Sequence, residues 1–167
     1  VIAMVQDKGA QKDYYKANGF PTSDYTLVDG KKHLKEAYTG GKKVLKLRRG
    51  GFDGRGVMML DTTADLKDAF DAPCVLEERV DIQAEIAVLC ARNRDGEVRS
   101  YPPVGMQFSE AANLLEFLMA PADLSPGVLR EATGIAQQLV SQLGMVGLLA
   151  VELFLDKQGK LWINEIA

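Results

Sequence analysis

Cysteine, histidine and tryptophan are scarce in this chain of 167 residues, which contains two, one and one of them. The two cysteines, Cys74 and Cys90, lack zinc-ligand spacing and are too few for a disulfide framework, so we expect a reducing, cytoplasmic compartment. The single histidine, His33, excludes catalytic sets with two imidazoles, and its lysine-rich neighbours predict an exposed side chain. No apolar run approaches the roughly 20 residues of a membrane span, so no membrane partner is expected.

An excess of positive charge is also missing. The 20 lysines and arginines stand against 23 acidic residues, which gives a net charge of −3 and an isoelectric point near 5.2. Proteins that coat nucleic acid rely on a basic surface, so no nucleic-acid partner is expected. Hydrophobic residues make up 47% and charged residues 26% of the chain, which is typical of one soluble globular domain.

Turn and capping signals divide the chain into short strands, joined mostly as hairpins, with a few helices between them. Helices are expected over 7–18, 30–38, 63–70 and 126–143. Strands are expected over 25–28, 43–47, 57–60, 74–78, 83–92, 97–102, 114–119, 147–155 and 160–166. This order predicts the α+β class with antiparallel sheets. A change of composition near residue 80 predicts two lobes, and the apolar strand that stops at Ala167 leads us to expect a piece of a longer protein.

A glycine-rich loop, RRGGFDGRG, runs from Arg48 to Gly56 between two predicted strands. Four glycines within residues 50–56 allow the backbone to approach a ligand closely. Free N–H groups and flanking arginines favour phosphate oxygens as that ligand. An exposed hairpin tip is the alternative, although a tight turn requires only one or two glycines. No helix follows directly, so the loop is neither a Walker loop nor a dinucleotide fingerprint.

Two lysines are candidates to reach the same phosphates. Strand alternation places Lys46 on one face with Val44 and Arg48, while Leu45 and Leu47 point the other way. By itself Lys46 resembles an edge lysine that faces solvent, but the adjacent glycine loop favours a phosphate contact. Lys8, near the start of the first helix, has the weaker signal of an ordinary surface lysine.

The last predicted hairpin carries a pair of carboxylates. If its loop has four residues, Asp156 pairs with Leu161, residue 154 faces 163, and Glu152 faces Glu165. Like charges about 5 Å apart at Cβ destabilise a sheet, and a divalent cation removes the conflict. Mg²⁺ takes one or two carboxylates together with phosphate oxygens. The alternatives are a pair that faces solvent or two carboxylates that share one proton.

A further acidic stretch joins the two halves of the chain. Glu77 to Val80 follows an apolar strand and can offer backbone groups to an adenine edge. Glu85 lies within the apolar strand that follows, where a carboxylate requires a partner such as ribose hydroxyls or a basic side chain. The pair Met58-Met59 and Trp162 are expected to serve packing.

These stretches together resemble the ATP-grasp domain of the 5-(carboxyamino)imidazole ribonucleotide synthases, a family of purine biosynthesis. The most specific segment, KLRRGGFDGRG from Lys46 to Gly56, is similar to the family pattern Lys-x-Arg-x-Gly-Gly-Tyr/Phe-Asp-Gly-Arg/Lys-Gly. The other matches follow in family order: Asp7-Lys8 with Gln11-Lys12, Gly19-Phe20-Pro21, Glu77 with Glu85, Tyr101-Pro102, Val146-Gly147, Glu152-Leu153-Phe154 and Ile163-Asn164-Glu165-Ile166-Ala167.

The resemblance implies an ATP-grasp fold with the nucleotide between a small lid lobe at about 22–77 and a second lobe at about 78–167, and further domains outside this chain. It implies that Glu152 and Glu165 bind Mg²⁺ and that Glu85 holds the ribose. The implied ATP contacts are Lys8 and Lys46 at the phosphates or partly the adenine, the lid residues Gly51, Phe52, Asp53, Gly54, Arg55 and Gly56, the adenine segment Glu77, Glu78, Arg79 and Val80, and Asn164.

The implied reaction is the carboxylation of 5-aminoimidazole ribonucleotide by bicarbonate, through carboxyphosphate, with conversion of ATP to ADP and phosphate. The expected partners are these small molecules, and the full-length protein is expected to be a cytoplasmic homodimer. No protein nucleophile is implied, which suits a sequence without a catalytic triad. The segment 105–108 lacks the acidic, Asn and His residues that many members carry, so the resemblance supports no site role there.

Three other functions remain open at this stage. The chain is compatible with another ATP-grasp carboxylate–amine ligase or carboxylase that uses a different acceptor. It is also compatible with a nucleotide-binding piece that performs no turnover. Nucleic-acid binding through the basic residues of 42–55 is disfavoured by the net negative charge.

Overall fold

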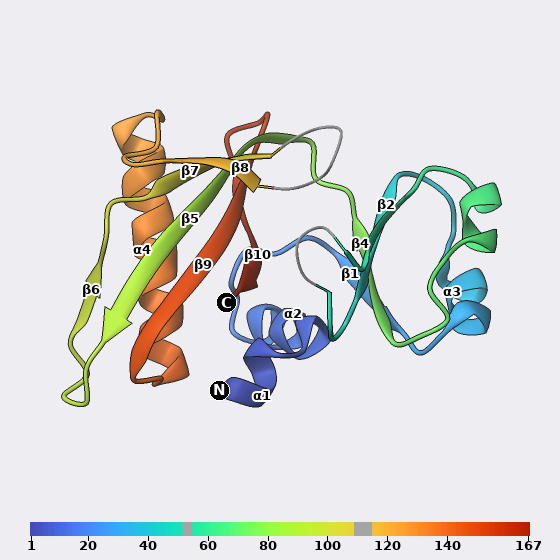
Figure 1. Cartoon of the computed structure of the whole chain (residues 1–167), viewed down its shortest axis with the longest axis horizontal. Coiled ribbons are helices and arrows are strands. Elements are labelled where there is room, and N and C mark those ends of the chain that lie inside the picture. Colours follow the sequence, from blue (N-terminus) through green and yellow to red (C-terminus); the bar gives the residue numbers. More distant parts are fainter. Residues whose placement is uncertain (52–54, 109–114) are drawn as a thin grey trace.

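The computed structural model describes residues 1–51, 55–108 and 115–167. In this part of the chain two antiparallel sheets lie side by side along the long axis of the molecule (Figure 1). The first has the order β1-β4-β2-β3, built from Tyr25–Val28, Cys74–Glu78, Lys43–Leu47 and Val57–Leu60. These bounds confirm the strands predicted in the first half of the sequence, because each apolar run is bounded by turn residues.

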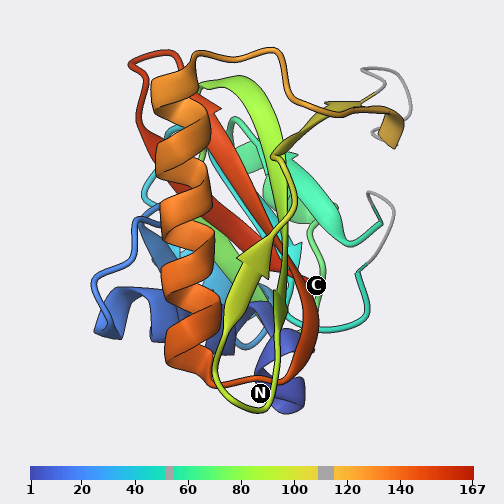
Figure 2. The ribbon, with the colours of Figure 1, turned by 90° about the vertical axis from the view of Figure 1, so that its left-hand side faces the viewer.

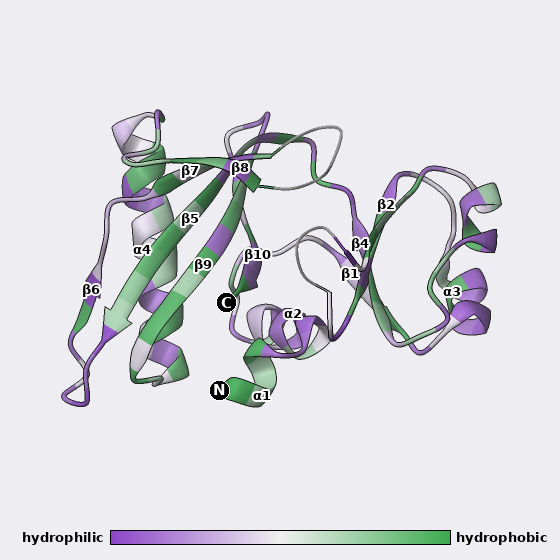
Figure 3. Ribbon diagram, viewed as in Figure 1, coloured by the Kyte–Doolittle hydropathy of each residue, from purple (hydrophilic) through white to green (hydrophobic). Residues whose placement is uncertain are grey.

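The second sheet has the order β10-β9-β5-β7-β8, with β6 paired to the far end of β5. Its long strands β5 and β9 form the centre, and both are rich in hydrophobic residues (Figure 3). The bounds are Leu161–Ile166 for β10, Gly147–Asp156 for β9, Ile82–Arg92 for β5, Val104–Phe108 for β7, Leu115–Met119 for β8 and Val98–Ser100 for β6. The antiparallel pairings and the flanking helices confirm the predicted α+β class.

Each sheet has its own hydrophobic core. The long helix α4, Pro126–Leu143, lies across one face of the second sheet (Figure 2) and buries Ala132, Ala136 and Leu139 against it. The short helix α3, Lys31–Ala37, and the 3₁₀ turn Thr63–Lys67 cover the first sheet, where the core is formed by Val28, Leu34, Leu45, Leu60 and Leu76. The two cores are separate from each other, and a cleft lined by both polar and apolar side chains lies between the sheets.

Helix α2, Lys8–Ala17, follows the short helix α1, Ile2–Val5, and lies near the middle of the molecule (Figure 1). It begins at the predicted cap, because the Asp7 carboxylate accepts hydrogen bonds from the backbone N–H groups of Gly9 and Ala10. Its fully buried Tyr15 belongs to the core of the second sheet. The following residues cross to the first sheet, so α2 stands at the junction of the two sheets.

Two expectations from the sequence require correction. Thr62, not Thr63, caps the helical turn, and the turn is a 3₁₀ helix that ends at Lys67 rather than a helix that reaches Phe70. Strand β7 was not expected, because Val104 to Phe108 contains Gly105 and lacks a regular alternation of polar and apolar residues. It forms because β5 and β8 supply hydrogen-bonding partners on its two sides. Among the described helices, none combines the length and hydropathy that crossing a bilayer requires.

Candidate functional site

A cleft of about 400 Å³ lies between the two sheets. Strands β2, β3 and β4 form one wall, and β5, β7, β9 and β10 form the other. Predicted site residues from both halves of the sequence line it, namely Lys8, Lys46, Gly51, Arg55, Glu77, Glu78, Arg79, Val80, Glu85, Glu152, Asn164 and Glu165. The structure therefore brings together residues that are up to 157 positions apart in the chain.

Strand β2 presents Lys46 to the cleft as the alternation predicted. Val44 and Lys46 line the cleft, whereas Leu45 and Leu47 pack into the core of the first sheet. The Lys46 ammonium donates a hydrogen bond of 2.7 Å to Oδ1 of Asn164 on the opposite sheet. It also lies 3.1 Å from a carboxylate oxygen of Glu77. Lys46 is therefore a buried cation in the wall of the cleft, fixed by Asn164 and Glu77, and not an edge lysine that faces solvent.

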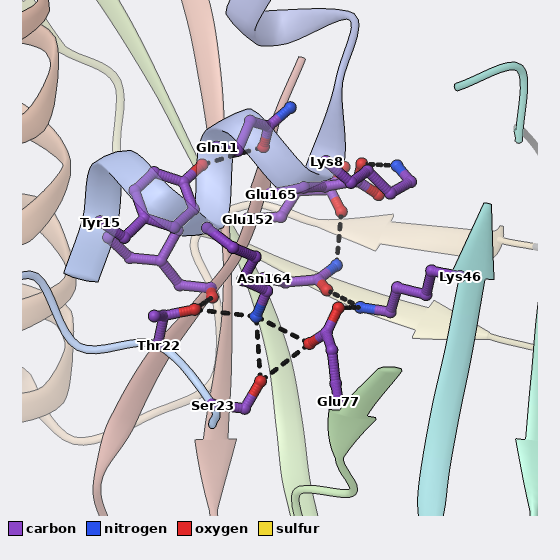
Figure 4. Close-up of polar contacts among 12 residues, drawn as sticks. Lys8, Gln11, Tyr15, Thr22, Ser23, Lys46, Glu77, Glu152, Asn164 and Glu165 are labelled. Atoms are coloured by element: carbon purple, nitrogen blue, oxygen red, sulfur yellow. Dashed lines mark hydrogen bonds and ion pairs between the residues drawn. The ribbon is translucent and has the colours of Figure 1, made fainter. Parts of the chain in front are cut away.

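Glu77 is the buried centre of a polar network (Figure 4). Its carboxylate lies 2.7 Å from the ammonium of Lys12 and accepts a hydrogen bond of 2.8 Å from the hydroxyl of Ser23. Burial raises the pKa of Glu77, but the charges of Lys46 and Lys12 and the hydrogen bonds outweigh it, so the pKa is lowered overall. Glu77 is therefore ionised, and only its backbone is left for the predicted adenine contact.

The rest of the predicted adenine segment forms the rim of the cleft. Glu78 pairs with Lys43, and Arg79 forms an ion pair of 3.0 Å with Asp61. Val80 lines the cleft together with these residues. These two ion pairs attach Glu78 and Arg79 to the first sheet, next to the backbone that an adenine edge would meet.

The carboxylate pair is formed in a different register from the one predicted. Leu161 pairs with Leu155 and Ile163 with Leu153, so the predicted pairings of 156 with 161 and of 154 with 163 are wrong. A β-bulge between Ile163 and Glu165 then shifts the register by one residue. Beyond the bulge Glu152 is directly opposite Glu165, as the sequence predicted.

The bulge also explains how two consecutive residues reach one cleft. In a regular strand Asn164 and Glu165 would point to opposite faces, yet both line the cleft. The Asn164 amide donates a weak hydrogen bond of 3.4 Å to Glu152 and accepts one from Lys46. At the bulge, β9 and β10 thus present two carboxylates, Glu152 and Glu165, and the Asn164 amide to the cleft.

Electrostatics show that these carboxylates are in conflict. Burial, and then the charge of Glu165, raises the pKa of Glu152. Burial and the charge of Glu152 raise the pKa of Glu85 to about 7. Among the described residues, Glu85 has neither a hydrogen-bond partner nor an ion-pair partner, so the basic partner considered from the sequence is not found there. A cation beside Glu152 and hydrogen-bond donors to Glu85 would stabilise the ionised forms of these carboxylates.

The pair Glu152 and Glu165 fits a divalent cation that takes its other ligands from a substrate. The described residues contain no cluster of three or more His, Cys, Asp or Glu side chains suited to a metal. Two facing carboxylates alone suit Mg²⁺, which keeps waters and commonly completes its shell with phosphate oxygens. Burial and the charge of Glu165 raise the pKa of Glu152, so a cation bound beside the pair would favour its ionised form.

The glycine loop enters the cleft where its ends are described. Gly51 and Arg55 line the cleft, while Phe52, Asp53 and Gly54 lie outside the described residues. A Cβ at Gly51 would lie 2.9 Å from the Arg55 carbonyl oxygen, so only glycine fits there without movement. Gly56 has a φ of +80°, which glycine adopts readily. The close approach of the two loop ends thus accounts for two of the four glycines.

Arg48 does not join Lys46 in the cleft as expected. Its guanidinium instead donates hydrogen bonds of 2.9 and 2.8 Å to the Asp7 carboxylate, which also caps α2. Burial raises the pKa of Asp7, but the Arg48 hydrogen bonds, with the helix N–H of Ala10, lower it overall to about 2. This contact anchors the start of the glycine loop to the start of α2.

A second cavity, of about 460 Å³, adjoins the cleft. Lys8, Gly51 and Glu165 line both cavities, and Arg48 and Arg49 add positive charge to the second one. Lys8 forms an ion pair with Glu165, so it belongs to this wall and is not an ordinary surface lysine. Gly51 of the predicted loop, Glu165 of the carboxylate pair and Lys8 thus meet where the two cavities join.

Several lining residues were missed from the sequence. Met106 and Phe108 of β7 line the cleft, although the resemblance assigned no site role to 105–108. Met59, expected in the core, is half exposed and lines the cleft, because it lies on the same face of β3 as Val57. No polar signal marks such apolar residues. His33 is exposed as predicted, and Trp162 donates a hydrogen bond to Asp156.

This architecture has counterparts among known proteins. The sequence pattern of the ATP-grasp domain matches residues 13–167. A curated relative from Mycobacterium tuberculosis strain H37Rv, N5-carboxyaminoimidazole ribonucleotide synthase, is 40% identical over 99% of this chain and 40% of the relative.

Solved structures are similar over the same span. N5-carboxyaminoimidazole ribonucleotide synthetase from Thermotoga maritima superposes with a TM-score of 0.84 at 36% identity and covers 99% of this chain and 42% of that one. An ADP complex of such a synthetase gives a TM-score of 0.89 at 30% identity, over 99% and 45% of the two chains. The chain spans between 40% and 48% of the length of the curated relatives that it matches.

Proposed function

Because this chain belongs to the ATP-grasp domain family, we propose that it is the nucleotide-binding part of an N5-carboxyaminoimidazole ribonucleotide synthase. Such an enzyme is a carbon–nitrogen ligase of purine biosynthesis. It joins bicarbonate to the exocyclic amine of 5-aminoimidazole ribonucleotide and converts ATP to ADP and phosphate. Relatives of this name that are 30% to 40% identical over almost the whole chain support the proposal. The observation that carries it is the cleft where Lys46, Arg55 and the pair Glu152 and Glu165 converge.

The lining of the cleft suits both ends of a nucleotide. Apolar side chains, Val44, Val80, Met106 and Phe154, would enclose an adenine ring. Lys8, Lys46 and Arg55 would supply positive charge for the phosphates, and the Lys46 ammonium lies 5.7 Å from the centre of the Phe154 ring, where the two kinds of lining meet. Glu85 would accept hydrogen bonds from ribose hydroxyls, which favour its ionised form. A relative solved as an ADP complex supports nucleotide binding by this chain.

Glu152 and Glu165 would hold Mg²⁺, with Asn164 beside them. When bound, this ion supplies positive charge that offsets the charge of the triphosphate. Glu165 would then interact with both the ion and Lys8, so part of the Lys8 charge would become available to the phosphates. Lys46 is already oriented by Asn164 and Glu77 and requires little rearrangement.

The chemistry requires no nucleophile from the protein. A bicarbonate oxygen attacks the γ-phosphorus, the bond to ADP breaks, and carboxyphosphate forms. The exocyclic amine then attacks its carbonyl carbon, phosphate leaves and the amine loses a proton. The chain's residues contribute positioning and charge, and the glycine loop would exclude water from the labile intermediate. The second cavity, which shares Lys8 and Glu165 with the cleft, would be the place for bicarbonate and the amine.

We also propose the wider setting that follows from this function. Residues 22–77 form the lid lobe and 78–167 the second lobe, and the ATP contacts are those that the family resemblance implies. The full-length protein is a cytoplasmic homodimer whose partners are small molecules. A second candidate function is nucleotide binding without turnover, because the candidate roles of the cleft residues all concern the nucleotide or its cation.

Calorimetric titration of the chain with ATP, with and without Mg²⁺, tests the binding site. Binding that strengthens with Mg²⁺ is expected, and absence of any nucleotide binding would contradict the whole proposal. Phosphate release is then measured with bicarbonate, with 5-aminoimidazole ribonucleotide, and with both. Stimulation that requires both identifies the ligase. Binding with no stimulation by any acceptor supports the second candidate.

A further inference from the structure

Lys12 is a fully buried lysine that no part of the proposed nucleotide chemistry uses. Its side chain is 2% exposed, and it lies on the face of α2 that turns toward β4. The Nζ atom lies 2.8 Å from the Thr22 hydroxyl, 2.9 Å from the Ser23 hydroxyl and 2.7 Å from the Glu77 carboxylate. Lys12 does not line the cleft, so its role must pass through these neighbours, of which Figure 4 labels Thr22, Ser23 and Glu77.

The hydrogen bonds around Lys12 identify it as an ammonium cation. The Thr22 hydroxyl donates to the Ile163 carbonyl, and the Ser23 hydroxyl donates to Glu77, so both accept from Lys12. The Glu77 carboxylate is the third acceptor. Three acceptors require three N–H donors, which only the protonated lysine has. Burial lowers the pKa of Lys12, and the charge of Glu77 opposes this decrease.

Glu77 divides one negative charge between two lysines. Its Oε2 atom is held by Lys12 and Ser23, while its Oε1 atom faces Lys46 at 3.1 Å. Two positive charges therefore flank one negative charge, and the cluster carries a net positive charge. Because Lys12 is enclosed and Lys46 lines the cleft, the surplus charge is presented to the cleft through Lys46.

We propose that Lys12 is a positioning residue that neutralises Glu77 and so leaves the charge of Lys46 available to the nucleotide phosphates. This inference rests on the proposed nucleotide site. Without the Lys12 charge, Glu77 would be a buried carboxylate with Lys46 as its only cation, and their attraction would strengthen in the low dielectric of the site. Lys46 would be drawn toward Glu77 and away from the phosphates.

The main test compares ATP with adenosine as probes in calorimetric titrations of Lys12→Gln. Glutamine can keep hydrogen bonds to Thr22 and Ser23 but carries no charge. We expect the affinity for ATP to fall roughly tenfold, which corresponds to the weakening of one charge-assisted contact, and adenosine to bind with unchanged affinity. Lys16→Gln, which removes an exposed lysine from the same helix, is the matched control and should change neither.

A rescue experiment separates the charge effect from a structural one. The double variant Lys12→Gln with Glu77→Gln removes both charges, so Lys46 is no longer drawn back and ATP affinity should return to within about threefold of wild type. An equal loss of ATP and adenosine affinity in Lys12→Gln, or a double variant as weak as the single, would overturn the proposal. So would Lys12→Gln with wild-type affinity for ATP.

If Lys12→Gln alone fails to fold, Glu77→Gln is compared with the double variant. The proposal requires these two to bind ATP equally, because Lys12 acts only through the Glu77 charge. A further tenfold loss in the double variant would contradict it. Wild-type protein that binds no ATP at all would instead overturn the proposed function, so the two failures are distinguishable.

Discussion

Lys8 at the start of α2 and Glu165 in β10 form an ion pair across the wall that the two cavities share. One partner is a candidate phosphate ligand and the other a candidate cation ligand. Each therefore neutralises the charge of the other in this structure. The ion pair thus links the candidate phosphate ligand directly to the candidate cation ligand.

The carboxylate pair should control the cation dependence of nucleotide binding. Glu152→Gln and Glu165→Gln each remove one candidate ligand, so the strengthening of ATP binding by Mg²⁺ should decrease roughly tenfold or more. A magnesium titration at fixed ATP measures it. Glu131→Gln, on the exposed face of α4, is the control. A titration like that of wild type in both variants would remove these residues from the cation site.

Two lysines on opposite faces of β2 should differ in their effect. Lys46→Ala removes a cation from the cleft, and a charge-assisted hydrogen bond contributes about 1.5–3 kcal/mol, so the Kd for ATP should rise roughly 10- to 100-fold. Lys43→Ala breaks only the contact with Glu78 at the surface and should change the Kd by less than about threefold. Binding curves for both variants test the face assignment, which equal losses would contradict.

Glu85 should make stability depend on pH. Its ordinary pKa of 4.5 is raised to about 7 in the folded state. Between these two values the unfolded chain loses the proton while the folded chain retains it, so the free energy of unfolding decreases as pH rises through this window. Above about pH 7 the decrease is complete.

Glu85→Gln removes this effect. The variant should be more stable than wild type by about 1–2 kcal/mol at pH 8, after allowance for solvent screening, and similar to it near pH 4.5. Urea unfolding at the two pH values measures the difference. Glu36→Gln removes an exposed carboxylate from α3 as a control. A constant difference between Glu85→Gln and wild type at both pH values would show that Glu85 ionises normally.

Substitution by alanine should have different effects at two glycines, a loss of ATP affinity at Gly51 and a gain of stability at Gly134. At Gly51 a Cβ would lie 2.9 Å from the Arg55 carbonyl oxygen, so the loop ends must move apart and ATP affinity should fall several-fold. Gly134 lies in α4 with nothing within 4 Å of an added Cβ, so Gly134→Ala should stabilise the protein by about 0.5–1 kcal/mol. Thermal unfolding and ATP titration of both variants test this contrast, and an unchanged affinity in Gly51→Ala would contradict the close approach.

The sequence predicted most elements because their signals are local. The Asp7 cap, the apolar period of α4 and the turn at Asp156 to Gly159 each specify structure within a few residues. The facing of Glu152 and Glu165 was predicted from a four-residue loop, but the ladder near that loop is offset by one residue. The bulge at Asn164 restores the pairing, and nothing local distinguishes such a bulge from a regular strand.

The parts of the site that were not predicted depend on tertiary contacts. Lys12 reads as an ordinary helix lysine, and its burial becomes evident only when β4 and residues 22–23 enclose it. Met106 and Phe108 line the cleft because the neighbouring strands place β7 there. Spacing along a chain cannot reveal a partner more than 50 positions away, such as Glu77 for Ser23.

Because of its bulge, β10 can place Glu165 across from Glu152 independently of whether it also presents an amide to Lys46. Excision of Asn164 would leave Glu165 directly after Ile163, in an unbroken ladder that still sets it across from Glu152. The same excision would remove the amide that orients the Lys46 ammonium. The gain or loss of one amino acid in β10, by natural variation or by design, can thus change how Lys46 is anchored while Glu152 and Glu165 still face each other.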